Sequence, residues 1–279
     1  MNPDSGLYGA NDGPALSAAN RHRRTALGVV GVLGFCLIWG LAASTVPTFL
    51  LPSPLEVGRA FVGELTTTVP TSVLGETVTV PRLILKLGQS LLHYVPGLVV
   101  GCTLGTALGI LMAWNETVDA VATPLVRILR PIPPLAWIVF AIVWIGIGHG
   151  GAAFIVFIGA FWITFYNGYA GVEGVPEELL EVASVFGGDD ESVVLRTVVL
   201  PSALPSVFTG IRTSIGQCWM IVVAAELFGA PGVGYQIIQA AQRLFLEVSV
   251  AYMLVISVVF LASDWLFRQL QRRALTWRT

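Results

Sequence analysis

Six apolar runs, separated by polar stretches, divide most of this sequence. They lie at residues 25–46, 88–114, 121–147, 152–171, 206–227 and 248–266. Each run has about 20 residues or more, the length that an α-helix needs to cross the hydrocarbon core of a bilayer. Within lipid every backbone N–H and C=O group needs a partner inside the protein, and a helix supplies these partners within one segment. The pattern therefore predicts an all-α integral membrane protein with about six transmembrane helices.

The composition of the chain supports this class. Hydrophobic residues make up 55% and charged residues 11% of the 279 residues, whereas about a quarter of a soluble domain is charged. The mean hydropathy is +0.78. The sequence shows no cluster of Lys and Arg that would bind nucleic acid. Cys36, Cys102 and Cys218 lie far apart in apolar runs, without the spacing of metal ligands, so we expect small buried hydrophobic side chains.

The polar segments predict the regions of the chain and their sides of the membrane. Residues 1–24 are predicted to be a disordered cytoplasmic tail, since they are rich in small and polar residues and end in an arginine cluster. Residues 25–46 are predicted to be the first transmembrane helix, with a cleaved signal peptide as the alternative. Residues 47–87 hold five prolines, and we expect an extracytoplasmic segment with an amphipathic helix near 55–65. Residues 88–270 form the core with five transmembrane helices, and residues 271–279 form a cytoplasmic C-terminal tail.

The interval 173–205 is a strongly polar part of this core. Residues 177–191 contain six acids in fifteen positions, a density that places them in water rather than in hydrocarbon. Pro176 and the acids after it suit the first turn of a helix, and Gly187 suits its end. A second short helix is expected over 191–199. We predict a helix–glycine–helix element between the fourth and fifth transmembrane helices.

A glycine repeat marks one face of the second apolar run. Gly97, Gly101, Gly105 and Gly109 recur every four residues and therefore share a slowly turning face. Small residues on such a face allow another helix to approach closely in lipid. The face is either an interface with a moving partner or a site of static packing.

Three prolines interrupt the third apolar run in the sequence RPIPPLAW at residues 130–137. Proline breaks a helix, and broken helices at membrane depth occur only inside protein or along a cavity. Pro133 and Trp137 are therefore candidates for a translocation pathway, and simple kinked packing is the alternative.

The fifth apolar run carries polar groups at membrane depth. Arg212 lies near its inner boundary, Gln217 near its middle and Glu226 near its outer boundary. Such groups within a membrane indicate function, or else a structural ion pair. Gln217, Trp219 and Glu226 join Pro133 and Trp137 as candidate pathway residues.

Several of these segments resemble the permeases of ATP-binding-cassette (ABC) importers. Glu181, Ala183 and Gly187, followed by Leu200-Pro201, resemble the cytoplasmic EAA loop of that family, with Val182 in place of a small residue and a gap one residue longer. RPIPPLAW, LPSPLEV at 51–57 and the fifth run resemble the nitrate, sulfonate and taurine subfamily. The resemblance covers about 40–275. It implies the type I ABC-importer permease architecture, in which Glu181, Ala183, Gly187, Leu200 and Pro201 contact the ATPase through a coupling helix.

The resemblance also implies partners and a function. The partners are an ABC ATPase subunit, an extracytoplasmic substrate-binding protein and a second copy of the permease in a homodimer. The protein would lie in the lipid of the cell membrane as a multi-pass protein, with both termini cytoplasmic. Its function would be to form the pathway for a small anionic or polar solute of the nitrate, sulfonate and taurine class.

The sequence lacks the residues of several kinds of enzyme. Lys86 is the only lysine, and no GxxxxGK[ST] phosphate loop is present, so we expect ATP hydrolysis on a separate subunit. No catalytic residue, cofactor or metal site is predicted. A stand-alone secondary transporter or channel is the alternative function. Such a protein needs ion-coupling acids or two matching halves, and the sequence offers Glu226 and no internal repeat.

Overall fold

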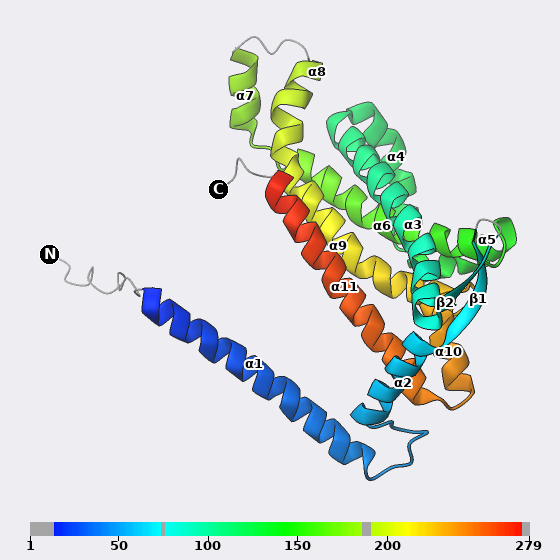
Figure 1. Ribbon diagram of the computed structural model, residues 1–279. Helices are drawn as coiled ribbons and strands as arrows, with labels where there is room; N and C mark the ends of the chain where they lie inside the picture. The colour runs from blue at the N-terminus through cyan, green and yellow to red at the C-terminus, as the bar shows by residue number, and fades with distance from the viewer. Residues whose placement is uncertain (1–13, 74–75, 186–190, 275–279) are drawn as a thin grey trace.

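The computed structural model describes residues 14–73, 76–185 and 191–274 (Figure 1). The long helices are α1 (Pro14–Ala43), α3 (Arg82–Trp114), α6 (His149–Glu173), α9 (Leu200–Glu226) and α11 (Leu246–Ala274). Shorter elements join them: α2 (Pro54–Thr66), β1 (Thr68–Val73), β2 (Glu76–Pro81), α4 (Glu116–Leu129), η1 (Pro134–Trp137), α5 (Ile138–Trp144), α7 (Glu177–Val185), α8 (Glu191–Val194), η2 (Leu195–Val199) and α10 (Val233–Gln242). Five helical segments within the described ranges are long and apolar enough to cross a membrane, or six if one bent pair counts as a span. The predicted all-α membrane class is confirmed.

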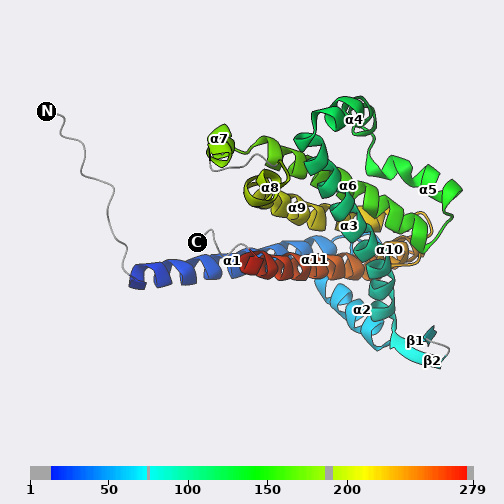
Figure 2. The ribbon, with the colours of Figure 1, turned by 90° about the horizontal axis from the view of Figure 1, so that it is seen from above.

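The elements gather at two ends of the helical bundle (Figure 1). The first residues of α1, the last residues of α11 and the helices α4, α7 and α8 lie toward one end, here called the α7–α8 end. The hairpin of β1 and β2 lies toward the other end with α2 and α10, and this is called the hairpin end. The long helices run between the two ends, and Figure 2 shows the axes of α1 and α11 roughly parallel, with the chain running through them in opposite directions.

The third apolar run is not one straight helix. The prediction that prolines interrupt the run 121–147 is confirmed, because α4 ends at Leu129 and the chain bends by 87° before η1 and α5. Pro131, Pro133 and Pro134 fall in this break. A proline removes a backbone donor and its ring collides with the preceding helical turn, so three of them within four residues end the helix.

The centre of the bundle is formed by α3, α6 and α9. A Cβ atom added to Gly97 would lie 2.5 Å from the carbonyl oxygen of Ala153, and one added to Gly101 would lie 2.6 Å from that of Phe157. Gly105 and Gly109 meet the carbonyl oxygens of Phe161 and Phe165 in the same way. The glycine repeat of α3 therefore packs against the backbone of α6, which no larger residue would allow.

Several helices extend beyond the predicted spans. Residues 14–24, expected to be disordered, are helical in α1, because adding turns to a formed helix costs little and the segment is rich in alanine. The helix α3 begins at Arg82 rather than 88, within the segment 47–87. The expected tail 271–279 is helical up to Ala274. Residues 1–13 and 275–279 lie outside the described ranges.

The hairpin end contains one predicted element and two that were not predicted. The amphipathic helix expected near 55–65 is α2, whose first turn is capped by Ser53 and Glu56. Hydrogen bonds from Ser53 lower the pKa of the Glu56 carboxyl group below its usual value. The β-branched stretches on either side of residues 74–75 pair as an antiparallel hairpin with Val69 opposite Val80. The segment between α9 and α11 contains the short helix α10, which was not predicted.

The interval between α7 and α9 also differs from its prediction. The expected second helix over 191–199 does not stop at Leu200-Pro201, because α8, η2 and α9 form one continuous helical segment from Glu191 to Glu226. The π-helical turn η2 directly precedes Pro201. A wider turn displaces the carbonyl group that the proline ring would otherwise meet four residues earlier. The proline is thus accommodated within the helix.

Candidate functional site

A groove with a volume of about 1110 Å³ runs between α9 and α11. Its wall is largely apolar, with Trp219, Met220, Val223, Leu227, Ile237, Met253, Ile256, Phe260 and Leu261. The uncharged polar side chains in its lining are Thr209, Thr213, Gln217, Ser257 and Gln271. The groove is large enough for a small solute, because ligand pockets typically have volumes of about 300–1,000 Å³.

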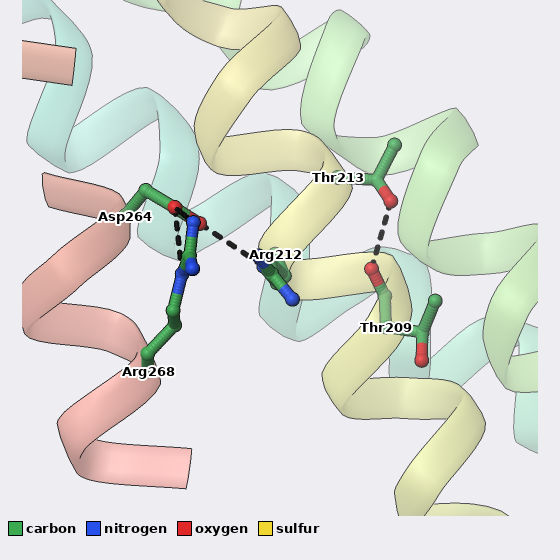
Figure 3. Close-up of polar contacts among 5 residues, drawn as sticks. All are labelled: Thr209, Arg212, Thr213, Asp264 and Arg268. Carbon is green, nitrogen blue, oxygen red and sulfur yellow. Dashed lines mark hydrogen bonds and ion pairs between the residues drawn. The ribbon is translucent and has the colours of Figure 1, made fainter. Parts of the chain in front are cut away.

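Three ionised side chains line this groove and contact one another (Figure 3). Arg212 lies in the half of α9 that follows α8, and Asp264 and Arg268 lie in the last half of α11, so the cluster is at the end of the groove nearer to α7 and α8. The Nε atom of Arg212 on α9 donates a hydrogen bond to Oδ1 of Asp264 on α11 at 3.0 Å. Arg268, one turn further along α11, donates from Nε to Oδ2 of the same carboxylate at 2.8 Å, and its Nη2 atom also contacts Oδ2. Two arginines thus share one aspartate, and the cluster has a net charge of +1.

Two threonines continue this polar region along α9. The hydroxyl group of Thr213 donates to the backbone oxygen of Thr209 at 2.9 Å, and that of Thr209 donates to the backbone oxygen of Pro205 at 2.8 Å. Their donors are therefore used within the helix. The hydroxyl oxygens remain as acceptors along the wall of the groove.

The five predicted pathway residues do not form one site. Gln217 is exposed and Trp219 is buried, and both line the groove. Trp219 also stacks on Tyr94 of α3, with ring centroids 4.2 Å apart. Pro133 is exposed in the break before η1, and Trp137 packs against the buried residues around Ile138. Neither of these two lines the groove.

Glu226 lies outside the groove in a buried polar network. Its side chain and that of His93 on α3 have no exposed surface, and His93 Nδ1 lies 2.9 Å from Glu226 Oε1. The other carboxylate oxygen accepts a hydrogen bond from the backbone N–H of Gly234, in the first turn of α10, at 2.7 Å. The Nε2 atom of His93 lies 2.6 Å from Nδ1 of His149, the first residue of α6. This network joins α3, α6, α9 and α10.

The α7 helix places both polar and apolar side chains on its surface. Leu180 packs against a buried cluster formed by Val172, Val175, Val199 and Ala203. Leu179 and Val182 are 44% and 53% exposed. An exposed apolar pair on a short helix indicates a contact with another molecule.

The predicted coupling residues lie in different parts of this region. Glu181 is exposed and Ala183 is half-buried on α7. Gly187 lies outside the described residues. Leu200 is half-buried and Pro201 is exposed in the first turn of α9.

The sequence analysis missed Asp264, Arg268 and His93 as site residues. Asp264 and Arg268 are four residues apart, so a helix places them on one face as an acid–base pair at the end of the apolar run 248–266. That spacing was a usable signal. His93 gave no comparable signal, because its partners are 56 and 133 residues away in the chain. In the described ranges no group of three or more His, Cys, Asp or Glu side chains is arranged to hold a metal ion.

Comparisons with known proteins give a consistent result. The family model described as "Binding-protein-dependent transport system inner membrane component" matches residues 105–276. The chain is 33% identical over 249 residues to the bicarbonate transport system permease protein CmpB of Synechococcus elongatus, covering 88% of each chain. It is 30% identical over 252 residues to the taurine transport system permease protein TauC of Escherichia coli, covering 89% of this chain and 88% of TauC. An inward-facing structure of the MetNI methionine ABC transporter matches with a TM-score of 0.53 and 22% identity, over 67% of this chain and 95% of that one.

Proposed function

Because the chain belongs to the inner membrane components of binding-protein-dependent transport systems, as an ABC permease of the nitrate, sulfonate and taurine type, we propose that it forms the translocation pathway of an ATP-driven importer. It is a multi-pass membrane protein with the fold of a type I importer permease. The family implies an ATPase and a substrate-binding protein as partners.

One observation carries the proposal: α7 packs on the helical segment that contains α8 and α9, and α9 forms one wall of the groove. The segment from Glu191 to Glu226 is a continuous helix, so a movement of α8 is transmitted along α9. The helix α9 supplies Gln217, Arg212 and several other residues to the groove. A partner that pushes on α7 and α8 would therefore change the groove.

The surface of α7 supports ATPase docking at this point. Leu179 and Val182 are exposed, while Leu180 holds the helix against the base of α6 and α9. Glu181, Ala183, Gly187, Leu200 and Pro201 are the coupling residues that the EAA resemblance implies. We place the ATPase contact on the exposed side of α7, with ATP hydrolysis on the partner. ATP can drive the permease between two states only if the ATPase contact differs between them.

The solute class is inferred from charge. The relatives named above are permeases of bicarbonate and taurine transport systems. Bicarbonate is an anion of the carbonate type, and taurine carries a sulfonate group. The groove of this chain has a net positive cluster and otherwise uncharged lining. A small anionic or polar solute, delivered by an extracytoplasmic binding protein, fits both features.

The exposed surface of α1 supports contacts outside this chain. Its apolar window is only 6% buried, and Leu37, Ile38 and Leu41 are each at least 67% exposed. We propose that this helix contacts membrane lipid and a second copy of the permease in a homodimer. We propose that the first residues of α1 and the last residues of α11 face the cytoplasm, because both lie toward the α7–α8 end and near arginine clusters.

A stand-alone secondary transporter is less well supported. Such a protein needs a carboxylate that binds a coupling ion near the middle of the membrane. Glu226 is fully buried and bound to His93 and Gly234, and Asp264 is paired with two arginines. Neither acid is free to bind a coupling ion in this arrangement.

The test is a charge introduced on the exposed apolar side of α7. Val182→Glu places a carboxylate where we propose an apolar contact, so copurification of the ATPase and binding-protein-stimulated ATP hydrolysis should fall by about tenfold or more. Val78→Glu is the matched control for copurification of the ATPase, because Val78 is 44% exposed and belongs to β2 at the hairpin end, away from α7. Equal ATPase association in both variants would contradict docking on α7.

A further inference from the structure

We propose that Arg212 and Arg268 bind the anionic group of the transported solute, and that Asp264 occupies these arginines when no solute is present. The inference rests on the function proposed above and adds to it the residues and the ligand chemistry: a carboxylate, carbonate or sulfonate group. The site lies at the end of the groove nearer to α7 and α8.

The charges of the groove attract an anion to this point. Arg212, Arg268 and Asp264 are the ionised residues of its lining, and they leave one positive charge without a counter-charge. The neighbouring residues Phe260 and Leu261 are apolar, and a cation beside low-dielectric surroundings interacts more strongly with an anion than it does in bulk water. An anionic solute entering the groove would therefore be stabilised here.

The arginines retain donors for a ligand. A guanidinium group has five N–H donors, and within the described part of the chain Arg212 uses only its Nε–H, on Asp264. The side chains of Arg212 and Arg268 are 44% and 52% exposed, whereas that of Asp264 is 11% exposed. The donors thus face the space that a solute can enter, and the carboxylate lies behind them. Planar carbonate and carboxylate groups, and sulfonate, suit the paired donors of a guanidinium.

Anion binding would also loosen α9 from α11. The bond between Arg212 and Asp264 joins these two helices, and the described residues contain no other side-chain hydrogen bond between them. A solute anion bound to the free Nη donors of Arg212 repels the Asp264 carboxylate and shares the same positive charge, so it weakens the bond between Arg212 and Asp264. Solute occupancy and the separation of α9 and α11 are then linked, because the anion makes different contacts in the two arrangements.

The experiment measures anion binding to the permease purified with its ATPase, in nanodiscs of phosphatidylcholine, by isothermal titration calorimetry. The probes are methanesulfonate and its neutral analogue methanesulfonamide. We expect the charged probe to bind more tightly than the neutral one. Arg212→Gln and Arg268→Gln should each weaken methanesulfonate binding by about tenfold or more, as expected for the loss of a charge-assisted hydrogen bond.

Three further variants separate this site from general electrostatics and from a folding defect. Asp264→Asn removes the internal competitor and should tighten methanesulfonate binding. Arg272→Gln is the matched control, because Arg272 lies one turn beyond Arg268 on α11 and does not line the groove. It should bind like the unaltered protein. Arg212→Lys keeps the positive charge and should retain part of the affinity for methanesulfonate. It therefore shows whether the loss in Arg212→Gln comes from the missing charge or from a folding defect.

Three results would overturn the inference. These are binding of both probes with equal affinity, no loss in either arginine variant, and weaker binding in Asp264→Asn. Arginine-dependent retention of phosphatidylglycerol without arginine-dependent binding of methanesulfonate would assign the cluster to lipid phosphate instead. If the ATPase fails to copurify with the unaltered chain, the proposed function fails; if it copurifies and no anion binds, only this inference fails.

Discussion

Glu226 is a charged residue without exposed surface, and its role follows from its partners. Its carboxylate is bound by His93 from α3 and by the backbone of Gly234 at the start of α10. The N–H groups of the first helical turn lack partners within a helix, and a carboxylate there is also favoured by the helix dipole. Glu226 therefore joins α10 to α3 and α9, and it lies outside the groove between α9 and α11.

Replacing Glu226 should separate hydrogen bonding from charge. Glu226→Leu leaves both His93 and the N–H of Gly234 without an acceptor, and loss of one member of a buried pair costs about 3–5 kcal/mol. Glu226→Gln keeps the shape and one acceptor oxygen, so a smaller loss is expected. Thermal unfolding of the two purified variants in detergent measures the difference. Equal losses would show that the hydrogen bond to Gly234 contributes little.

The candidate site could be predicted from the sequence only in part. Gln217 was identified because a polar residue in an apolar run is conspicuous, and it lines the groove. Glu226 was placed with it, but nine residues at about 100° each put the two on opposite sides of a helix. A helical projection would have separated them. The partners of Arg212 could not be assigned, because Asp264 is 52 residues away and the packing of α9 on α11 brings them together.

The helices were predicted best where the length of an apolar run is enough to identify a transmembrane helix. The runs at 88–114, 152–171, 206–227 and 248–266 correspond to α3, α6, α9 and α11, with their ends displaced. The prolines of the third run predicted its break. They did not predict the bend of 87°, because this angle depends on the residues against which α5 packs. The ten residues of α10 are too few for a span, and the capping by Glu226 that helps to hold them comes from another element.

The contact between α3 and α6 makes a prediction about glycine. Gly101→Ala would place a Cβ atom 2.6 Å from the carbonyl oxygen of Phe157 and 2.7 Å from Cβ of Ala160, so the two helices must separate. We expect a loss of about 1–3 kcal/mol, as for other overpacked sites. Gly88→Ala on the same helix meets nothing within 4 Å and should be neutral or slightly stabilising. Thermal unfolding of both variants in detergent is the measurement.

One result with this pair of variants would contradict the described packing of α3 on α6. If Gly101→Ala unfolds at the same temperature as Gly88→Ala, α3 and α6 are not held at the separation described here. A loss of transport without loss of stability in Gly101→Ala would instead indicate that this interface moves during the transport cycle.

In the whole molecule, the two ends of the bundle should lie on opposite sides of the membrane. The long helices run between the ends, with α7 and α8 at one and the β1–β2 hairpin at the other (Figure 1). ATP is available in the cytoplasm, so the proposed ATPase contact requires the α7–α8 end to face that side. The binding protein then meets the hairpin end, where α2 and α10 lie.

Cysteine labelling tests this orientation. Glu178→Cys on α7 and Thr77→Cys on β2, made as separate variants, introduce exposed thiols at the two ends, in a chain whose Cys36 is replaced by Ala and whose Cys102 and Cys218 are buried. A membrane-impermeant maleimide added to intact cells should label the Thr77→Cys variant and not the Glu178→Cys variant, because a charged reagent does not cross the bilayer. In permeabilised cells both variants should be labelled. Labelling of the Glu178→Cys variant in intact cells would place α7 outside, where no ATPase could reach it, and would end the importer proposal.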